Sequence, residues 1–296
     1  MAALHDKIEN ALNEARILVL GGQVLIGSAY RSVFEPGFEK LSHSVQNVRL
    51  IALVLMLGGL GLLLVPPAFH RIVEQGEDTA RFHRLVTHVL EIALLPFAIG
   101  LGVDVYTTMG FVRPGWIDLL FGLVMIALAI LLWYIFAIFR RQPVPKDDKA
   151  QPTSLTEKIK EALIEARMIL PGAQALLGFQ VASTLTDSFE KLPRMPKWFH
   201  FASLLAIALS TILLIAPAAY HRIALQGEDD QEFYRLSGRF LIMAMIFLSA
   251  GISAELFVVV QRINNSYIFS ATLSTVIFIL FNAMWFGYSF LKKKSS

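Results

Sequence analysis

Polar side chains that recur 151 residues apart are the residues best suited to chemistry in this sequence. They comprise acids, arginines and one histidine in each copy: Glu14, Arg16, His70, Arg71, Glu77, Asp78 and Arg84, repeated as Glu165, Arg167, His221, Arg222, Glu228, Asp229 and Arg235. Histidine titrates near neutral pH, and these groups could form two equivalent gates or ion-binding mouths. The same groups at helix ends could instead only lock helices together, with the basic side chains reaching the headgroups.

A second recurring pair is acidic and lies deeper in its hydrophobic segments. Asp104 aligns with Glu255, each predicted about one turn from the outer end of its helix. A charge retained in both copies indicates a cation attractant or proton acceptor, unless both side chains simply reach the outer interface. Gln23 and Gln174 also recur, beside glycines, and are predicted to line the middle of an ion pathway or to hydrogen-bond across a close helix contact.

The composition places these residues in a membrane protein. The chain has 296 residues, of which 55% are hydrophobic and 17% charged, and its mean hydropathy is +0.59. A soluble domain carries roughly 25% charged residues, so an ordinary cytosolic enzyme is excluded. The absence of cysteine excludes disulfides and thiolate chemistry. A net charge of only +3, without a dense basic stripe, gives no support for a nucleic-acid partner.

Hydropathy predicts an all-α fold with eight membrane-spanning helices. A span needs about 20 mostly apolar residues. The segments that meet this measure are 17–34, 50–69, 85–106, 116–139, 168–185, 201–220, 236–259 and 267–291. We therefore expect a polytopic membrane protein.

The eight segments form a tandem duplication of a four-helix unit. The strongest matching block is His70-Arg71-Ile72-x-x-Gln75-Gly76-Glu77-Asp78, which recurs from His221 to Asp229. We predict one repeat over 1–141, a cytoplasmic linker over 142–156 and a second repeat over 157–296. Because four helices return the chain to its starting side, the repeats should be parallel and related by a pseudo-twofold axis along the membrane normal. Of the 26 Lys and Arg residues, 18 lie on the side that holds both predicted termini, which indicates that this side is cytoplasmic.

Several of these motifs resemble a known family. They are Glu14-Ala15-Arg16, Gly21-x-Gln23, Phe38-Glu39-Lys40-Leu41 and Pro66-x-x-x-His70-Arg71. The pattern resembles small bacterial membrane proteins of four helices that carry a domain of unknown function, here fused as two units. The resemblance implies a multi-pass protein of the bacterial inner membrane, and it implies no activity.

The function we expect is passage of a small ion or proton through a channel or transporter. The alternative is a non-catalytic membrane scaffold or regulatory subunit, in which the polar residues only hold helices together. An enzyme acting on a lipid or a quinone would need an apolar cleft open to the bilayer beside an acid or a histidine. The sequence shows no catalytic motif, and no cofactor or metal is expected. The predicted partners are the lipid bilayer, a small ion and a second copy of the chain in a homo-oligomer.

Overall fold

The computed structural model describes residues 4–112, 114–139, 153–226 and 228–294, and every regular element within these ranges is helical. The first repeat contains α1 (Leu4–Ser32), the 3-10 helix η1 (Phe38–Lys40), α2 (His43–Leu63), α3 (Val65–Phe69), the π-helix η2 (His70–Glu74), α4 (Ala80–Val112), α5 (Trp116–Ile130), the π-helix η3 (Leu131–Ile135) and α6 (Phe136–Phe139). The second contains α7 (Leu155–Thr184), α8 (Asp187–Glu190), α9 (Arg194–Ile223), α10 (Gln231–Asn264), α11 (Tyr267–Asn282), the π-helix η4 (Ala283–Gly287) and α12 (Tyr288–Lys294). Most of the predicted linker 142–156 lies outside the described residues.

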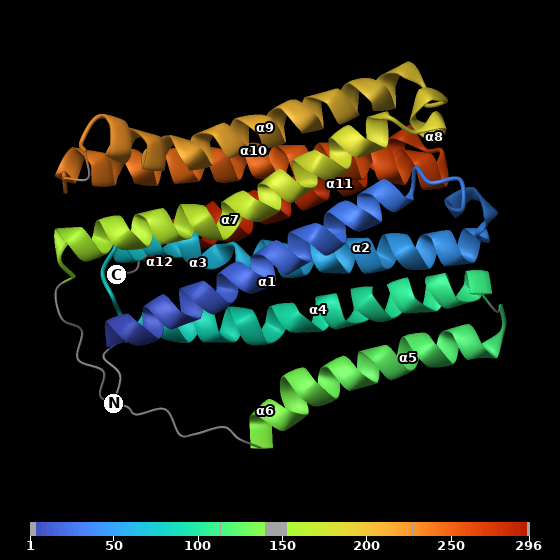
Figure 1. The fold of residues 1–296 in the computed structure, drawn as a ribbon, viewed down its shortest axis with the longest axis horizontal. Helices are drawn as coiled ribbons and strands as arrows, with labels where there is room; N and C mark the ends of the chain where they lie inside the picture. Colours follow the sequence, from blue (N-terminus) through green and yellow to red (C-terminus); the bar gives the residue numbers. More distant parts are fainter. Residues whose placement is uncertain (1–3, 113, 140–152, 227, 295–296) are drawn as a thin grey trace.

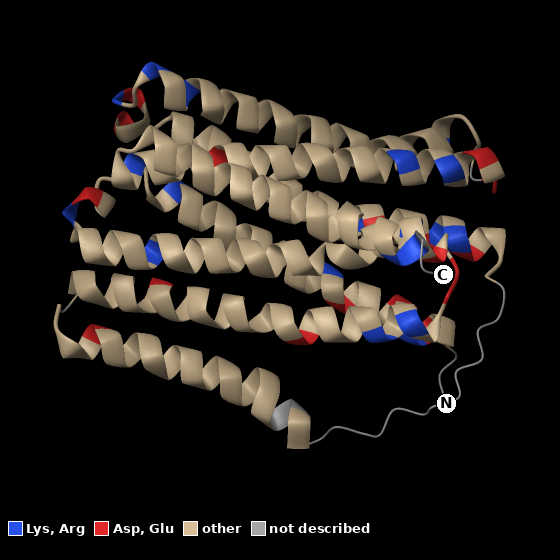
Figure 2. Ribbon diagram, turned by 180° about the vertical axis from the view of Figure 1, so that it is seen from behind, with Lys and Arg blue, Asp and Glu red and all other residues tan. Residues whose placement is uncertain are grey.

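Seven helical stretches are long and apolar enough to cross a membrane, which indicates a membrane protein. They are His43–Glu74, Ala80–Val112, Trp116–Ile135, Leu155–Thr184, Arg194–Ile223, Gln231–Asn264 and Tyr267–Lys293. The helix α1 is long but is not among them, because its charged first half and Gln23 lower its hydropathy. Lys, Arg, Asp and Glu gather mainly near the two ends of the bundle (Figure 2).

The two repeats meet along α1 and α7, which lie side by side and run in the same direction (Figure 1). Residues at equivalent repeat positions touch near both ends of this contact. Lys160 Nζ lies 2.8 Å from Glu9 Oε2, and Arg31 donates to the carbonyl oxygen of Ala182 over 2.9 Å. In a lipid environment such helices associate through close packing and polar contacts rather than through the hydrophobic effect.

The repeats differ in the placement of their fourth helices. In the first repeat α5 packs mainly against α4 at one side of the bundle, and Gly122 is its only buried residue (Figure 1). In the second repeat α11 packs on α10 and also contacts α2 of the first repeat. The indole Nε1 of Trp285, in η4, donates to the carbonyl oxygen of Gly61 over 2.8 Å. The fourth helices therefore break the symmetry that the sequence repeat suggests.

The chain also departs from the predicted helix ends near the polar residues. Pro66 and Pro67 lack backbone N–H donors, and the helix is interrupted at Leu64 before it continues as α3 and η2. The equivalent helix α9 contains only Pro217 in that region and stays regular to Ile223.

The loop after η2 begins with two left-handed residues, and the deep carboxylates lie further from their helix ends than predicted. Gln75 is the left-handed C-cap of η2, and Gly76 continues the left-handed turn. Asp104 and Glu255 lie about two turns from the ends of α4 and α10 rather than one, because both helices extend further than the hydropathy indicates.

Candidate functional site

A buried group of ionisable side chains lies between the repeats, where η2 packs against α7. Glu165 is fully buried and binds two neighbours from the first repeat. Its Oε1 lies 2.6 Å from Nδ1 of His70, and its Oε2 accepts a hydrogen bond from Nε of Arg71 over 2.5 Å. His70 also stacks on the ring of Phe82, with centroids 4.4 Å apart. The negative charge of Glu165 is thus compensated.

Glu161 lies one helical turn before Glu165, on the same face of α7, and lacks the close hydrogen-bond partners that Glu165 has. Its side chain is 1% exposed, and neither carboxylate oxygen has a hydrogen-bond partner among the residues that the structure describes. Its nearest nitrogens are Nε2 of His70, at 3.7 Å from Oε2, and Nδ1 of His5, at 3.6 Å from Oε1. A carboxylate left in this state costs several kcal/mol unless it is protonated or binds a cation.

Asp78 completes the group from the loop between η2 and α4. Its Oδ2 lies 2.7 Å from Nδ1 of His5, while its Oδ1 is buried and has no partner in the described part of the chain. The backbone N–H of Asp78 donates to Oγ1 of Thr153, and the left-handed turn at Gln75 and Gly76 directs the loop back toward α1. We call His5, His70, Asp78, Glu161 and Glu165 the His70 cluster.

Glu77, next to this cluster, holds the loop against the start of α7. It accepts hydrogen bonds from Nζ of Lys158 and from the backbone N–H of Thr153, the latter over 3.0 Å. These bonds, the one from Lys158 above all, lower the pKa of Glu77 below its usual value.

Most of the second copy of the polar motif is exposed. His221 stacks on Phe233 as His70 does on Phe82. Oγ1 of Thr156 lies 2.5 Å from Asp229, at the positions equivalent to His5 and Asp78. Glu14, the equivalent of Glu165, is exposed, and the buried Nε2 of His221 has no hydrogen-bond partner among the described residues. The exposed members of the predicted set are Glu14, Arg84, Arg167, Arg222, Glu228, Asp229 and Arg235, whereas Arg16 is half-buried. Within the described residues, the buried ion-paired arrangement therefore surrounds His70 and is not repeated around His221.

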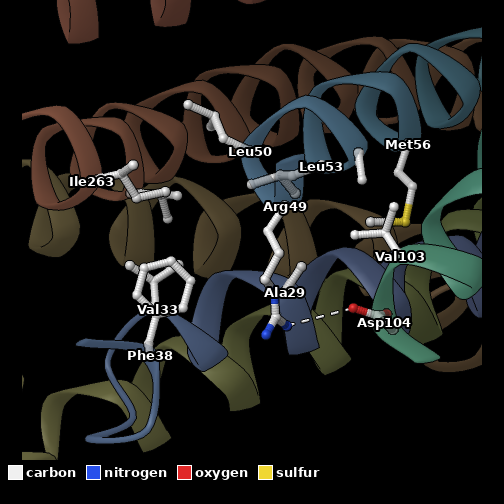
Figure 3. Close-up of a pocket in the computed structure, with 12 residues that line it drawn as sticks. Ala29, Val33, Phe38, Arg49, Leu50, Leu53, Met56, Val103, Asp104 and Ile263 are labelled. Atoms are coloured by element: carbon white, nitrogen blue, oxygen red, sulfur yellow. Dashed lines mark hydrogen bonds and ion pairs between the residues drawn. The ribbon is translucent and has the colours of Figure 1, made fainter. Parts of the chain in front are cut away.

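The two deep carboxylates each pair with a basic side chain from a neighbouring helix of their own repeat. Asp104 Oδ1 lies 3.5 Å from Arg49, beside a cavity of about 10 Å³ that has room for roughly one water molecule (Figure 3). At the equivalent positions of the second repeat, Glu255 lies 2.9 Å from Nδ1 of His200. Both members of this second pair are about 1% exposed, while the side chain of Asp104 is 36% exposed.

The Glu255 pair belongs to a wider buried network. Nε2 of Gln180 donates to Glu255 over 3.1 Å and to the hydroxyl of Ser203, which in turn donates to the carbonyl oxygen of Gly251. Tyr30 enters from the first repeat and donates to the carbonyl oxygen of Ile252 over 3.0 Å. We call Tyr30, Gln180, His200, Ser203 and Glu255 the His200 cluster.

Gln23 and Gln174 occupy different surroundings. Gln23 is fully buried in the α1–α7 contact, and neither polar atom of its amide has a hydrogen-bond partner among the described residues. Gln174 is exposed. The predicted ion-pathway residues therefore separate: Gln23 and Glu255 lie in the interior, whereas Gln174 and, in part, Asp104 face outward.

His5, Glu161 and His200 were not identified from the sequence. The repeat comparison selects residues that recur, and the equivalents of these three are Thr156, Asn10 and Arg49. A usable signal was present for Glu161: it lies four residues before Glu165, so both carboxylates must share one face of a helix.

A groove of about 590 Å³ lies between α4 and the α5–η3 segment. Its lining is largely apolar and includes Trp133 and Tyr134, with Glu91 at one side. The hydroxyl of Tyr134 donates to the carbonyl oxygen of Glu91 over 2.5 Å. The groove supplies the apolar cleft and the acid that a lipid- or quinone-modifying enzyme would need, but its described lining contains no histidine.

Comparison with known proteins identifies the family and no activity. Two consecutive segments, residues 4–137 and 150–289, each match the model of a family of unknown function, DUF6328, as expected for a tandem duplication. No curated protein and no solved structure matches the chain. The family match covers nearly the whole sequence and confirms the resemblance to an uncharacterised family. The chain therefore belongs to the DUF6328 family and carries two copies of its unit.

Proposed function

We propose that this protein is a transporter that moves protons across the bacterial inner membrane along the contact between α1 and α7. The observation that carries the proposal is Glu161, a buried carboxylate without a hydrogen-bond partner among the described residues, placed between two histidines. A protein that used polar residues only to hold helices together would gain nothing from such a group, because a buried carboxyl group without hydrogen bonds is destabilising.

The polar residues along this contact, here called the stations of the path, are Glu161, Gln23 and Gln180, and they are spread over the thickness of a bilayer. Glu161 and Gln180 lie 19 residues apart on α7, or about 28 Å, close to the ~30 Å of a hydrocarbon core. Gln23 lies between them and packs against Gly172. The path would run from the His70 cluster through the amide of Gln23 to the His200 cluster. Carboxylate, imidazole and phenol groups all exchange protons, so the proton is the cation that these stations suit best.

The packing between the stations supports a gated transporter rather than an open channel. Val19, Ile26 and Ala173 are fully buried in the hydrophobic core that separates the two clusters. Protons would therefore cross only when the repeats rearrange or when water enters between the stations.

The membrane orientation we propose follows the distribution of basic residues. The start of α1 and the end of α12 lie at one end of the bundle (Figure 1), and most Lys and Arg residues belong to that side in the sequence. The positive-inside rule then places both termini in the cytoplasm and the His70 cluster at the cytoplasmic side. The eight helices would form two parallel repeats around a pseudo-twofold axis between α1 and α7, with the fourth helices placed unequally.

Proteoliposomes test the proposal directly. A potassium diffusion potential would drive proton uptake, read by a pH-sensitive dye inside the vesicles, for the wild type and for Glu161→Gln. We expect the substitution to reduce uptake by an order of magnitude, while Glu14→Gln, on the exposed equivalent of Glu165, leaves uptake unchanged. Absence of flux for protons, potassium, sodium and chloride in turn, with intact and correctly oriented protein, would favour the scaffold or regulatory subunit instead.

A further inference from the structure

We propose that His5, Asp78 and Glu161 form a binding site for one divalent transition-metal ion of the zinc type. The three residues come from α1, from the loop before α4 and from α7, so the ion would join the two repeats. This metal site shares Glu161 with the proposed proton path, but it does not depend on proton passage, because it requires only the arrangement of these side chains.

The distances between the candidate ligand atoms fit a metal centre. One atom from each side chain, Nδ1 of His5, an Asp78 oxygen and a Glu161 oxygen, lies within 4.8 Å of the other two. Nδ1 of His5 is 2.7 Å from Asp78 Oδ2 and 3.6 Å from Glu161 Oε1. Ligands about 2.0 Å from a tetrahedral zinc ion are roughly 3.3 Å apart, so both separations from His5 lie within about 0.6 Å of the value that zinc requires.

Three carboxylate oxygens of the site are available to a cation. Both oxygens of Glu161 and Oδ1 of Asp78 are buried, and none of the three has a hydrogen-bond partner in the part of the chain that the structure describes. Arg71 donates from Nε to Glu165 and attracts Glu161 without a hydrogen bond to it. A divalent ion would neutralise both carboxylates at once and satisfy their free oxygens.

The donor set selects the class of metal. Imidazole nitrogen together with carboxylate oxygen suits zinc and its neighbours, whereas magnesium and calcium prefer oxygen ligands alone. His70 offers a fourth ligand, which would be the second nitrogen: its Nε2 has no hydrogen-bond partner among the described residues and lies 3.7 Å from Glu161 Oε2.

An acid behind His70 orients its ring for such a site. Nδ1 of His70 lies 2.6 Å from Oε1 of Glu165, whereas Nε2 of His5 lies 3.9 Å from Glu9, beyond hydrogen-bond distance. A carboxylate behind a histidine ligand is the usual arrangement around protein-bound zinc.

The sequence repeat provides a matched control. The equivalents of His5, Asp78 and Glu161 are Thr156, Asp229 and Asn10, so the second copy retains one carboxylate and no histidine. Asp229 is exposed and accepts a hydrogen bond from Thr156. The proposal therefore requires one ion per chain and requires that Asp229 take no part in binding.

The test is zinc binding by the full-length protein in detergent. A chelator would first remove bound metal from each protein, and Zn²⁺ would then be titrated into it in a calorimeter. The proteins are the wild type, His5→Ala, Glu161→Gln, Asp78→Asn and Asp229→Asn. The melting temperature of each would also be recorded with and without the metal. We expect one site per chain in the wild type and in Asp229→Asn. The three ligand variants should bind at least about tenfold more weakly and lose the metal-induced rise in melting temperature.

The melting temperature of the metal-free protein distinguishes loss of the metal site from misfolding of a variant. Glu161→Gln removes a charge without changing shape, so its melting temperature without metal should equal or exceed that of the wild type. A folded Glu161→Gln variant that binds Zn²⁺ as the wild type does would overturn the proposal, as would a wild type that binds none or an equal loss in Asp229→Asn. Proton uptake is measured separately, so a failed metal site with intact uptake would leave the proposed function standing.

Discussion

Gln23 of the first repeat lies directly against the backbone of Gly172 in the second: a Cβ atom built on Gly172 would fall 1.5 Å from the Gln23 amide oxygen. The contact is possible only because residue 172 has no side chain. It brings α1 and α7 close together, as small residues do between helices that pack tightly in lipid. The reciprocal contact is missing, since Gly21 has nothing within 4 Å of such an atom.

Gly172→Ala should destabilise the protein, whereas Gly21→Ala should not. The new methyl group must displace the Gln23 side chain or separate the helices, at a cost of about 1–3 kcal/mol. At position 21 the methyl group meets open space, and replacing a helical glycine by alanine favours the helix. Thermal unfolding of both variants in detergent provides the comparison, and equal melting temperatures would contradict the packing described.

Glu165→Ala should be among the most damaging substitutions in the chain. It would leave Arg71 buried without its carboxylate, and breaking a buried ion pair by removing one partner costs about 3–5 kcal/mol. Glu14→Ala, at the exposed equivalent position, should change the free energy of unfolding by less than about 0.5 kcal/mol. Denaturant titration of the two variants checks this, and similar losses in both would mean that the second copy also forms a buried site.

The bond between Glu77 and Lys158 should make stability depend on pH in the acid range. The pKa of Glu77 is lower in the folded protein than in the unfolded chain, so its contribution is fully present above the unfolded pKa of about 4.3 and is lost as the pH falls through the folded value. Because the side chain is 42% exposed, the contribution is small, at most about 1 kcal/mol. Glu77→Gln should therefore lower the melting temperature at pH 7 and leave it unchanged near pH 3. A difference that grows on acidification would contradict this sign.

Much of the architecture was predictable from the sequence, because hydropathy and internal repetition report directly on helix number and duplication. Of the eight predicted spans, seven correspond to helices that are long and apolar enough to cross a membrane. The exception is the span in α1, whose polar residues serve the contact with α7 instead. The family match in two consecutive segments agrees with the duplication.

The single candidate site was not predictable by the same reasoning. Because His70 and His221 recur in the two halves, the repeat predicts the same surroundings for both. Among the described residues, however, the buried carboxylate of Glu165 pairs with His70 and not with His221. That difference comes from packing: Pro67 helps to interrupt the first helix before η2, and the fourth helices take unequal places. Asp104 and Glu255 diverge for a simpler reason, because their partners are an arginine and a histidine. Neither packing nor partners can be read from periodicity.

The most direct test of the proposed proton path compares Glu255→Gln with Asp104→Asn in proteoliposomes under a potassium diffusion potential. Glu255 lies in the His200 cluster on the proposed path, whereas Asp104 is its repeat equivalent outside the path and is paired with Arg49. The account predicts that Glu255→Gln lowers proton uptake by an order of magnitude and that Asp104→Asn retains the wild-type rate. Equal rates in the two variants, whether both normal or both abolished, would contradict a single path along α1 and α7.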